Sequence, residues 1–152
     1  MSLLPLFSWL GDSAAGRFMQ GATWAFASVE VVHLLGLALL GGAVLILGLR
    51  AVGVILPDQP LGVLARGLVA LLSAGLVTLI ASGVLLVADG PLRYYANAAF
   101  RLKMALLLAA ILSGLHVYRA LQRGSQPTRV AIVISALLWL GVGLAGRAIG
   151  LL

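Results

Sequence analysis

Glu30 and His33 have the clearest capacity for chemistry in this sequence, because they interrupt a long apolar stretch. They lie three residues apart and would therefore share one face of a helix. Ionisable side chains are costly in hydrocarbon, so each is a candidate functional residue by default. Lys103 lies at a similar depth in a later apolar stretch, which allows a Glu30–Lys103 ion pair that Arg147 could join.

This polar group has two interpretations. The ion pair could neutralise itself and fix the order of the helices around it. Alternatively, Glu30, His33 and Lys103 form a polar site near one membrane face, which binds a cofactor or passes protons. Asn97 and Ser82 lie at a similar height and could contribute to such a site.

His33 and His116 are the two histidines of the chain, and they suggest haem b or another metal. Imidazoles from the helices of a four-helix bundle are the usual ligands of haem that is held without covalent attachment. The sequence has no C-x-x-C-H motif, which excludes covalent attachment of a c-type haem. The histidines therefore make haem b the cofactor that we expect first.

The depths of the two histidines oppose a single shared haem. At the rise of a helix, His33 should lie roughly 16 Å and His116 roughly 28 Å below the same membrane face. The two residues could share an iron only if a helix tilts, slides by two turns or breaks at Gly41–Gly42. Otherwise each serves its own site, the first completed by Lys103, Met104 or a partner subunit. His116 could also be a simple solvated side chain at the membrane boundary.

Other kinds of chemistry find little support. The chain has four acidic residues and one Glu-x-x-His motif, whereas di-iron bundles need that motif twice with two further glutamates. The absence of cysteine excludes disulfides, thiolate metal sites and cysteine catalysis. No phosphate-binding glycine loop, Ser-His-Asp arrangement or basic groove with interleaved aromatics is present, so we expect neither nucleic-acid binding nor catalysis by this chain alone.

The elements that must position these residues are membrane spans. Hydrophobic residues make up 62% of the chain and charged residues 9%, and the mean hydropathy is +1.17. Soluble domains contain only about 45–50% apolar residues. A span needs about 20 mostly apolar residues. Four stretches qualify as spans, at about 22–49, 64–88, 98–120 and 130–150.

Short links with helix-stop residues separate the four stretches, for example Pro57-Asp58-Gln59-Pro60 and Asp89-Gly90-Pro91. Short links favour antiparallel neighbours, so the sequence predicts an all-α, single-domain, four-helix up-down bundle. The apolar segment at about 2–12 is too short to span and lacks a basic region before it. It is therefore expected to lie in the membrane interface, anchored by Phe7 and Trp9, rather than to be a cleaved signal peptide.

The distribution of basic residues gives an orientation. Side A denotes the membrane face at which the first span begins, and side B the opposite face. Side B holds Arg50, Arg66, Arg119, Arg123 and Arg129 in or beside short links. The positive-inside rule then places side B in the cytoplasm and both termini outside. We expect a multi-pass protein of a bacterial inner membrane, in contact with lipid and with further copies or other membrane subunits.

Several of these residues also match a known pattern. The matching elements, in order, are Trp24 with Glu30-Val31-Val32-His33-Leu34-Leu35-Gly36, Leu49-Arg50 with Gly53, Asn97-Ala98-Ala99-Phe100-Arg101-Leu102-Lys103, His116, and Trp139 with Gly146-Arg147. On these elements the chain resembles a bacterial family of small four-span membrane proteins of unassigned function. That family is itself similar to copper-resistance D proteins and membrane b-type cytochromes. The family usually has an acidic residue before Leu49-Arg50, where this chain has Gly48.

The resemblance implies haem binding and electron transfer on the cytochrome side, and metal movement across the membrane on the copper-resistance side. Membrane b-type cytochromes usually carry four histidines, whereas this chain has two. The leading expectation is a haem-b-binding electron-transfer protein or redox-complex subunit. His33 and His116 would be its ligands, and Glu30, Lys103 and Arg147 would orient the group or pair with its propionates. The alternatives are a proton or copper-like metal transporter or channel subunit, and a structural subunit of a larger assembly.

Overall fold

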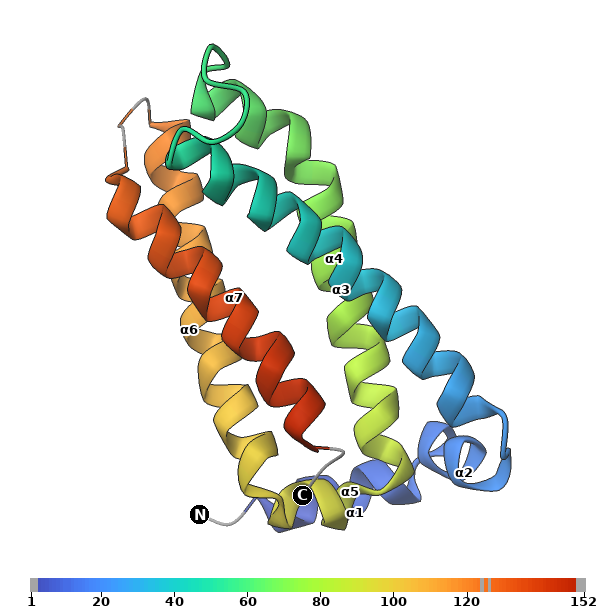
Figure 1. Cartoon of the computed structure of the whole chain (residues 1–152). Coiled ribbons are helices and arrows are strands. Elements are labelled where there is room, and N and C mark those ends of the chain that lie inside the picture. The colour runs from blue at the N-terminus through green and yellow to red at the C-terminus, as the bar shows by residue number, and fades with distance from the viewer. Residues whose placement is uncertain (1–2, 124, 126, 150–152) are drawn as a thin grey trace.

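The protein is all-α over the residues that the structure, a computed structural model, describes, which are 3–123, 125 and 127–149. Seven helices lie in this part of the chain and no strand does (Figure 1). In chain order they are α1 Leu4–Asp12, α2 Ala14–Gly21, α3 Ala25–Ala51, α4 Leu61–Asp89, α5 Pro91–Ala96, α6 Ala98–Gln122 and α7 Arg129–Ile149. The helices α3, α4, α6 and α7 are long and apolar enough to cross a membrane.

The four long helices match the predicted spans to within a few residues, because the predicted breakers end them. Pro60 immediately precedes α4, and Pro91 occupies the first turn of α5, where its missing N–H costs nothing. Asn97 begins α6 by accepting a hydrogen bond at Oδ1 from the backbone N–H of Phe100, at 3.0 Å. In the link after α3, Gly53 adopts a φ of +84°, which glycine reaches without steric cost.

Three short helices, α1, α2 and α5, gather at the end of the molecule where α3 begins (Figure 1). This is side A. The predicted interfacial segment at about 2–12 corresponds to α1, whereas α2 and α5 were not predicted. Aromatic rings join α1 to α5 and to the start of α6, since the Phe7 ring lies 5.3 Å from that of Tyr95 on α5 and 6.1 Å from that of Phe100 on α6.

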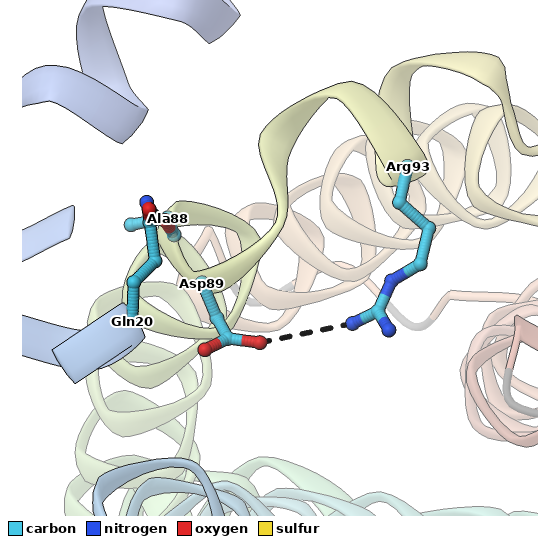
Figure 2. Close-up of polar contacts among 4 residues, drawn as sticks. All are labelled: Gln20, Ala88, Asp89 and Arg93. Atoms are coloured by element: carbon cyan, nitrogen blue, oxygen red, sulfur yellow. Dashed lines mark hydrogen bonds and ion pairs between the residues drawn. The ribbon is translucent and has the colours of Figure 1, made fainter. Parts of the chain in front are cut away.

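Polar contacts tie the short helices to α4 (Figure 2). Gln20 on α2 donates a hydrogen bond from Nε2 to the carbonyl of Ala88, at 3.0 Å. Asp89 at the end of α4 pairs with Arg93 on α5, with 3.8 Å between the charged atoms. Both contacts satisfy polar groups at the end of a span, where the apolar helix meets the membrane surface.

The spans pack as two neighbouring pairs, α3 with α4 and α6 with α7, and α3 also packs against α7. Packing between α4 and α6 is sparser. The predicted all-α class is therefore confirmed, as are four membrane-spanning lengths. The regular up-down bundle stays a prediction.

Glycines bring α3 and α4 unusually close. A methyl group on Gly75 would lie 2.7 Å from the backbone N of Leu40 and 2.9 Å from the carbonyl O of Gly36. A methyl group on Gly36 would lie 2.9 Å from Cγ2 of Thr78. Small residues allow this approach, which gives membrane helices their close van der Waals contact. The face of α4 that carries Gly75, Thr78 and Ser82 is thus the face that packs against α3.

The apolar core lies away from side A. Leu40, Ala110, Trp139 and Val142 form its central cluster. Ala51, Val117 and Ile132 form a second cluster close to side B, at the end of α3 and the beginning of α7. The polar candidates near side A therefore lie beyond one edge of the core.

Replacing Gly75 by Ala should destabilise the protein, because the new methyl group meets backbone atoms of α3 that cannot rotate away. Overpacking of this kind costs about 1–3 kcal/mol. Gly67→Ala on the same helix is the matched control, since nothing lies within 4 Å of a methyl group there. Thermal unfolding in detergent should show a lower melting temperature for Gly75→Ala alone, and equal melting temperatures would contradict the close contact.

Candidate functional site

His33 on α3 reaches across to α4. Its Nδ1 lies 2.8 Å from the hydroxyl oxygen of Ser82, and the two side chains form a hydrogen bond between the helices. Ser82 is buried, whereas His33 is half-buried. The predicted intramembrane histidine therefore has a fixed neighbour inside the molecule.

The hydrogen bonds of Ser82 determine which nitrogen of His33 carries the proton. The Ser82 hydroxyl donates to the carbonyl of Thr78, one turn earlier on α4. A hydroxyl has one proton, so toward His33 the same oxygen must accept. The Nδ1 of His33 is then the N–H donor, and in the neutral imidazole Nε2 carries a lone pair. Among the described residues, Nε2 has no hydrogen-bond partner.

Two glycines make room for the polar side chains of this region. The position of a methyl group on Gly83 would be 3.4 Å from Cε1 of His33, so the imidazole ring lies against a bare stretch of α4. Gly146 on α7 likewise leaves space for the side chain of Lys103 on α6. A methyl group on Gly146 would lie 3.3 Å from Nζ of Lys103. Lys103 is half-buried and lies against α7. The polar site is thus the contact of His33 with Ser82 between α3 and α4, and Lys103 is a separate half-buried cation toward the same end of the molecule.

The Glu30–Lys103 ion pair that the sequence allowed is absent from the structure. Among the residues that the structure describes, Asp89 and Arg93 form the one ion pair. Glu30 is exposed, although it shares α3 with His33. Residues three apart on a helix point in directions that differ by about 60°, because three residues turn the helix by about 300°. This offset lets His33 face α4 while Glu30 faces outward.

Arg147 and Asn97 are also separate from this site. Arg147 is exposed near the end of α7, and it does not join an ion pair with Glu30 or Lys103 within the described residues. The side-chain oxygen of Asn97 is used in the N-cap of α6. Asn97 therefore has a structural role here, which its position directly before an apolar helix already indicates.

His33 and His116 do not share a site. Both α3 and α6 begin at side A, and His33 is the ninth residue of α3 while His116 is the nineteenth of α6. Ten residues correspond to about 15 Å along a helix axis. The helix α3 is continuous through Gly41–Gly42, so the break that could have removed the mismatch does not occur. His116 is exposed, and its neighbour Val117 belongs to the cluster near side B.

The hydrogen bonds that begin at His33 form a short chain, which passes through Ser82 and ends at the carbonyl of Thr78. Toward side B from there lies the apolar cluster of Leu40, Ala110, Trp139 and Val142. No group of three or more histidine, cysteine or acidic side chains within the described ranges could hold a metal ion. The arrangement is thus a single imidazole that Ser82 orients at the contact between α3 and α4.

Ser82 was predicted from the sequence to lie near the height of the site, but its hydrogen bond to His33 was not predicted. The contacts of Gly83 and Thr78 in this region, and that of Gly146 with Lys103, were not predicted either. A usable signal existed, because Gly75, Thr78 and Ser82 share one face of α4 and mark it as the face that a neighbouring helix approaches.

Comparison with known proteins identifies the family. The family of unknown function DUF6644 matches residues 6–152, nearly the whole chain, and the chain belongs to that family. No curated protein and no solved structure matches the chain. The expected membership of a family of unassigned function is confirmed, while the similarity to copper-resistance D proteins and b-type cytochromes is not shown.

The hydrogen bonds of Ser82 predict that neutral His33 carries its proton on Nδ1. Nitrogen-15 NMR spectra of the histidine rings in detergent at alkaline pH should show this form for His33. Ser82→Ala removes the acceptor, so the ring should then populate the Nε2–H form as well. His116, which is exposed, serves as the internal reference in every sample. A wild-type His33 protonated on Nε2 would contradict the proposed bonding.

Proposed function

We propose that this DUF6644 protein is a membrane protein that holds haem b near side A through Nε2 of His33, and that it transfers electrons as a subunit of a redox assembly. One observation carries the proposal: the Ser82 hydroxyl binds Nδ1–H of His33 and leaves Nε2 with a lone pair. Metal-ligating histidines almost always donate their other ring N–H to an oxygen in this way, which fixes both the tautomer and the ring orientation.

Charge near side A supports the proposal. Lys103 lies half-buried against Gly146, toward the side A end of α7. Lys103 and the exposed Arg147 at the same end of α7 would be the cations that pair with the propionates of a bound haem. Charge-assisted contacts to carboxylates are among the stronger hydrogen bonds in proteins. A bound haem iron would supply the one-electron chemistry.

His33 would supply one ligand to a haem, and a second ligand would have to come from elsewhere. His116 lies about 15 Å from the level of His33, so it cannot be the second ligand. The apolar cavity between the spans is lined by neither histidine. We therefore propose that a second copy or another membrane subunit completes the site. The exposed carboxylate of Glu30 on the same span supports this, because a charge in hydrocarbon requires a polar partner.

Transport across the membrane is supported less well by the geometry. A proton or metal path requires polar groups over the whole depth of the bilayer, whereas those beside His33 end at Thr78. Apolar packing around Leu40 and Trp139 follows. In a purely structural subunit, the hydrogen bond between His33 and Ser82 would serve only helix packing.

The proposed location is the inner membrane of a bacterium, with side B in the cytoplasm. The four apolar spans support a multi-pass membrane protein. Arginines follow or precede the spans at side B, as the positive-inside rule requires of the cytoplasmic face.

The absorption spectrum of the protein tests the proposal. Protein purified in mild detergent from haem-replete cells should show a Soret band, and His33→Ala should abolish it. His116→Ala is the matched control and should leave the band unchanged, because His116 lies at the other end of the molecule. A wild-type protein without a Soret band, or equal spectra for the two variants, would overturn the haem assignment.

A further inference from the structure

A partly open apolar cavity of about 270 Å³ lies between the four spans, on the side B half of the molecule. Residues of α4 and α6 line it together with Leu40 and Val44 of α3 and Trp139 of α7, and of these Leu40 and Trp139 are buried. The rim residues Val69 and Leu115 are exposed, so the cavity opens sideways between α4 and α6, toward lipid. We refer to it as the α4–α6 groove.

Two polar groups at the bottom of this groove lack partners. Ser135 and Trp139 line the groove and are only 7% and 8% exposed. A methyl group on Gly114, across from them on α6, would lie 3.9 Å from Oγ of Ser135 and 3.8 Å from Nε1 of Trp139. Neither side chain forms a hydrogen bond with any residue that the structure describes. The two donors therefore converge on the space that Gly114 leaves free.

These donors still touch open space, and that space is the groove. Among the described residues, no fully enclosed side-chain nitrogen or oxygen lacks a partner, so Oγ of Ser135 and Nε1 of Trp139 are not sealed off. An unsatisfied donor in hydrocarbon costs several kcal/mol. Ser73, also in the groove, differs because its hydroxyl donates to the carbonyl of Val69 at 2.8 Å. Ser135 and Trp139 on α7 can therefore donate hydrogen bonds to a bound acceptor.

The depth of the pair limits what that acceptor can be. Trp139 is the middle residue of α7, which runs from Arg129 to Ile149, so about 15 Å of helix extends on each side. The hydrocarbon core is about 30 Å thick. The ester carbonyls of glycerolipids lie at its edges and cannot reach Trp139 without drawing their headgroups into the membrane. The occupant must be an apolar molecule whose own carbonyl group enters the hydrocarbon.

We propose that the α4–α6 groove binds an isoprenoid quinone, with one ring carbonyl accepting hydrogen bonds from Nε1 of Trp139 and Oγ of Ser135. The flat head lies against Gly114, and the isoprenoid tail leaves between the exposed apolar rims of α4 and α6 toward lipid. This class combines a carbonyl-bearing ring with an entirely apolar tail, which the groove requires. The site is separate from His33, which does not line the groove, and the proposal does not depend on haem binding.

Quinone binding can be measured by fluorescence in nanodiscs. In a Trp9→Phe/Trp24→Phe background, Trp139 is the single tryptophan, and ubiquinone with two isoprene units should quench it saturably. Ser135→Ala should raise the dissociation constant about three- to tenfold, the range expected for one lost hydrogen bond. Ser73→Ala makes the same chemical change in the same groove at a hydroxyl that is already bonded, and it should leave the constant unchanged.

Two further measurements complete the test. The dimethyl ether of the corresponding quinol keeps the ring and tail but replaces both carbonyls with methoxy groups, and it should bind at least tenfold more weakly. If Ser135→Ala impairs folding, Trp139→Phe replaces it, with binding measured from the quinone retained with the protein after gel filtration. Equal constants for Ser135→Ala and Ser73→Ala, or equal binding of the ether, would overturn the proposal and identify the groove as a place for lipid acyl chains.

Discussion

The site depends on one serine hydroxyl between two helices. Ser82 donates to the carbonyl of Thr78 within α4 and accepts from Nδ1 of His33 on α3. In hydrocarbon, water cannot replace either bond, so both partners are held in place. The bond is possible because Gly36 and Gly75 let the two helix backbones approach closely enough for the side chains to meet. Close packing and the orientation of the imidazole are thus consequences of the same contact.

Polar groups are distributed unevenly along the membrane normal, and this gives the molecule two different regions. In the half toward side A, His33 and Lys103 use space beside glycines. Toward side B, aliphatic packing dominates, and the buried side chains of Ser135 and Trp139 line the α4–α6 groove. The oriented imidazole and the groove therefore lie at different depths and are separate features of the molecule.

Some residues of the site could be identified from the sequence, and others could not. His33 and Lys103 were identified as candidates from the sequence because ionisable residues in a span are rare and costly. The pairing of Glu30 with Lys103 was wrong, because equal depth does not specify the direction in which a side chain leaves its helix. Asn97 was assigned to the site by height alone, whereas its side chain caps α6. Ser135 gave no signal, and Trp139 was noted only as part of the family pattern, since a single serine or tryptophan in an apolar stretch usually contributes only to packing.

The sequence by itself determined the four spans, their ends and the depth of each ionisable residue. These follow from local properties: the length of an apolar stretch, proline and glycine at its ends, and a fixed rise per residue. Only the tertiary structure decided which side chains meet, because that depends on helix rotation and on how closely glycines allow the backbones to approach. The tertiary structure therefore decides three features: the bond from His33 to Ser82, the outward position of Glu30 and the placement of the two donors in the groove.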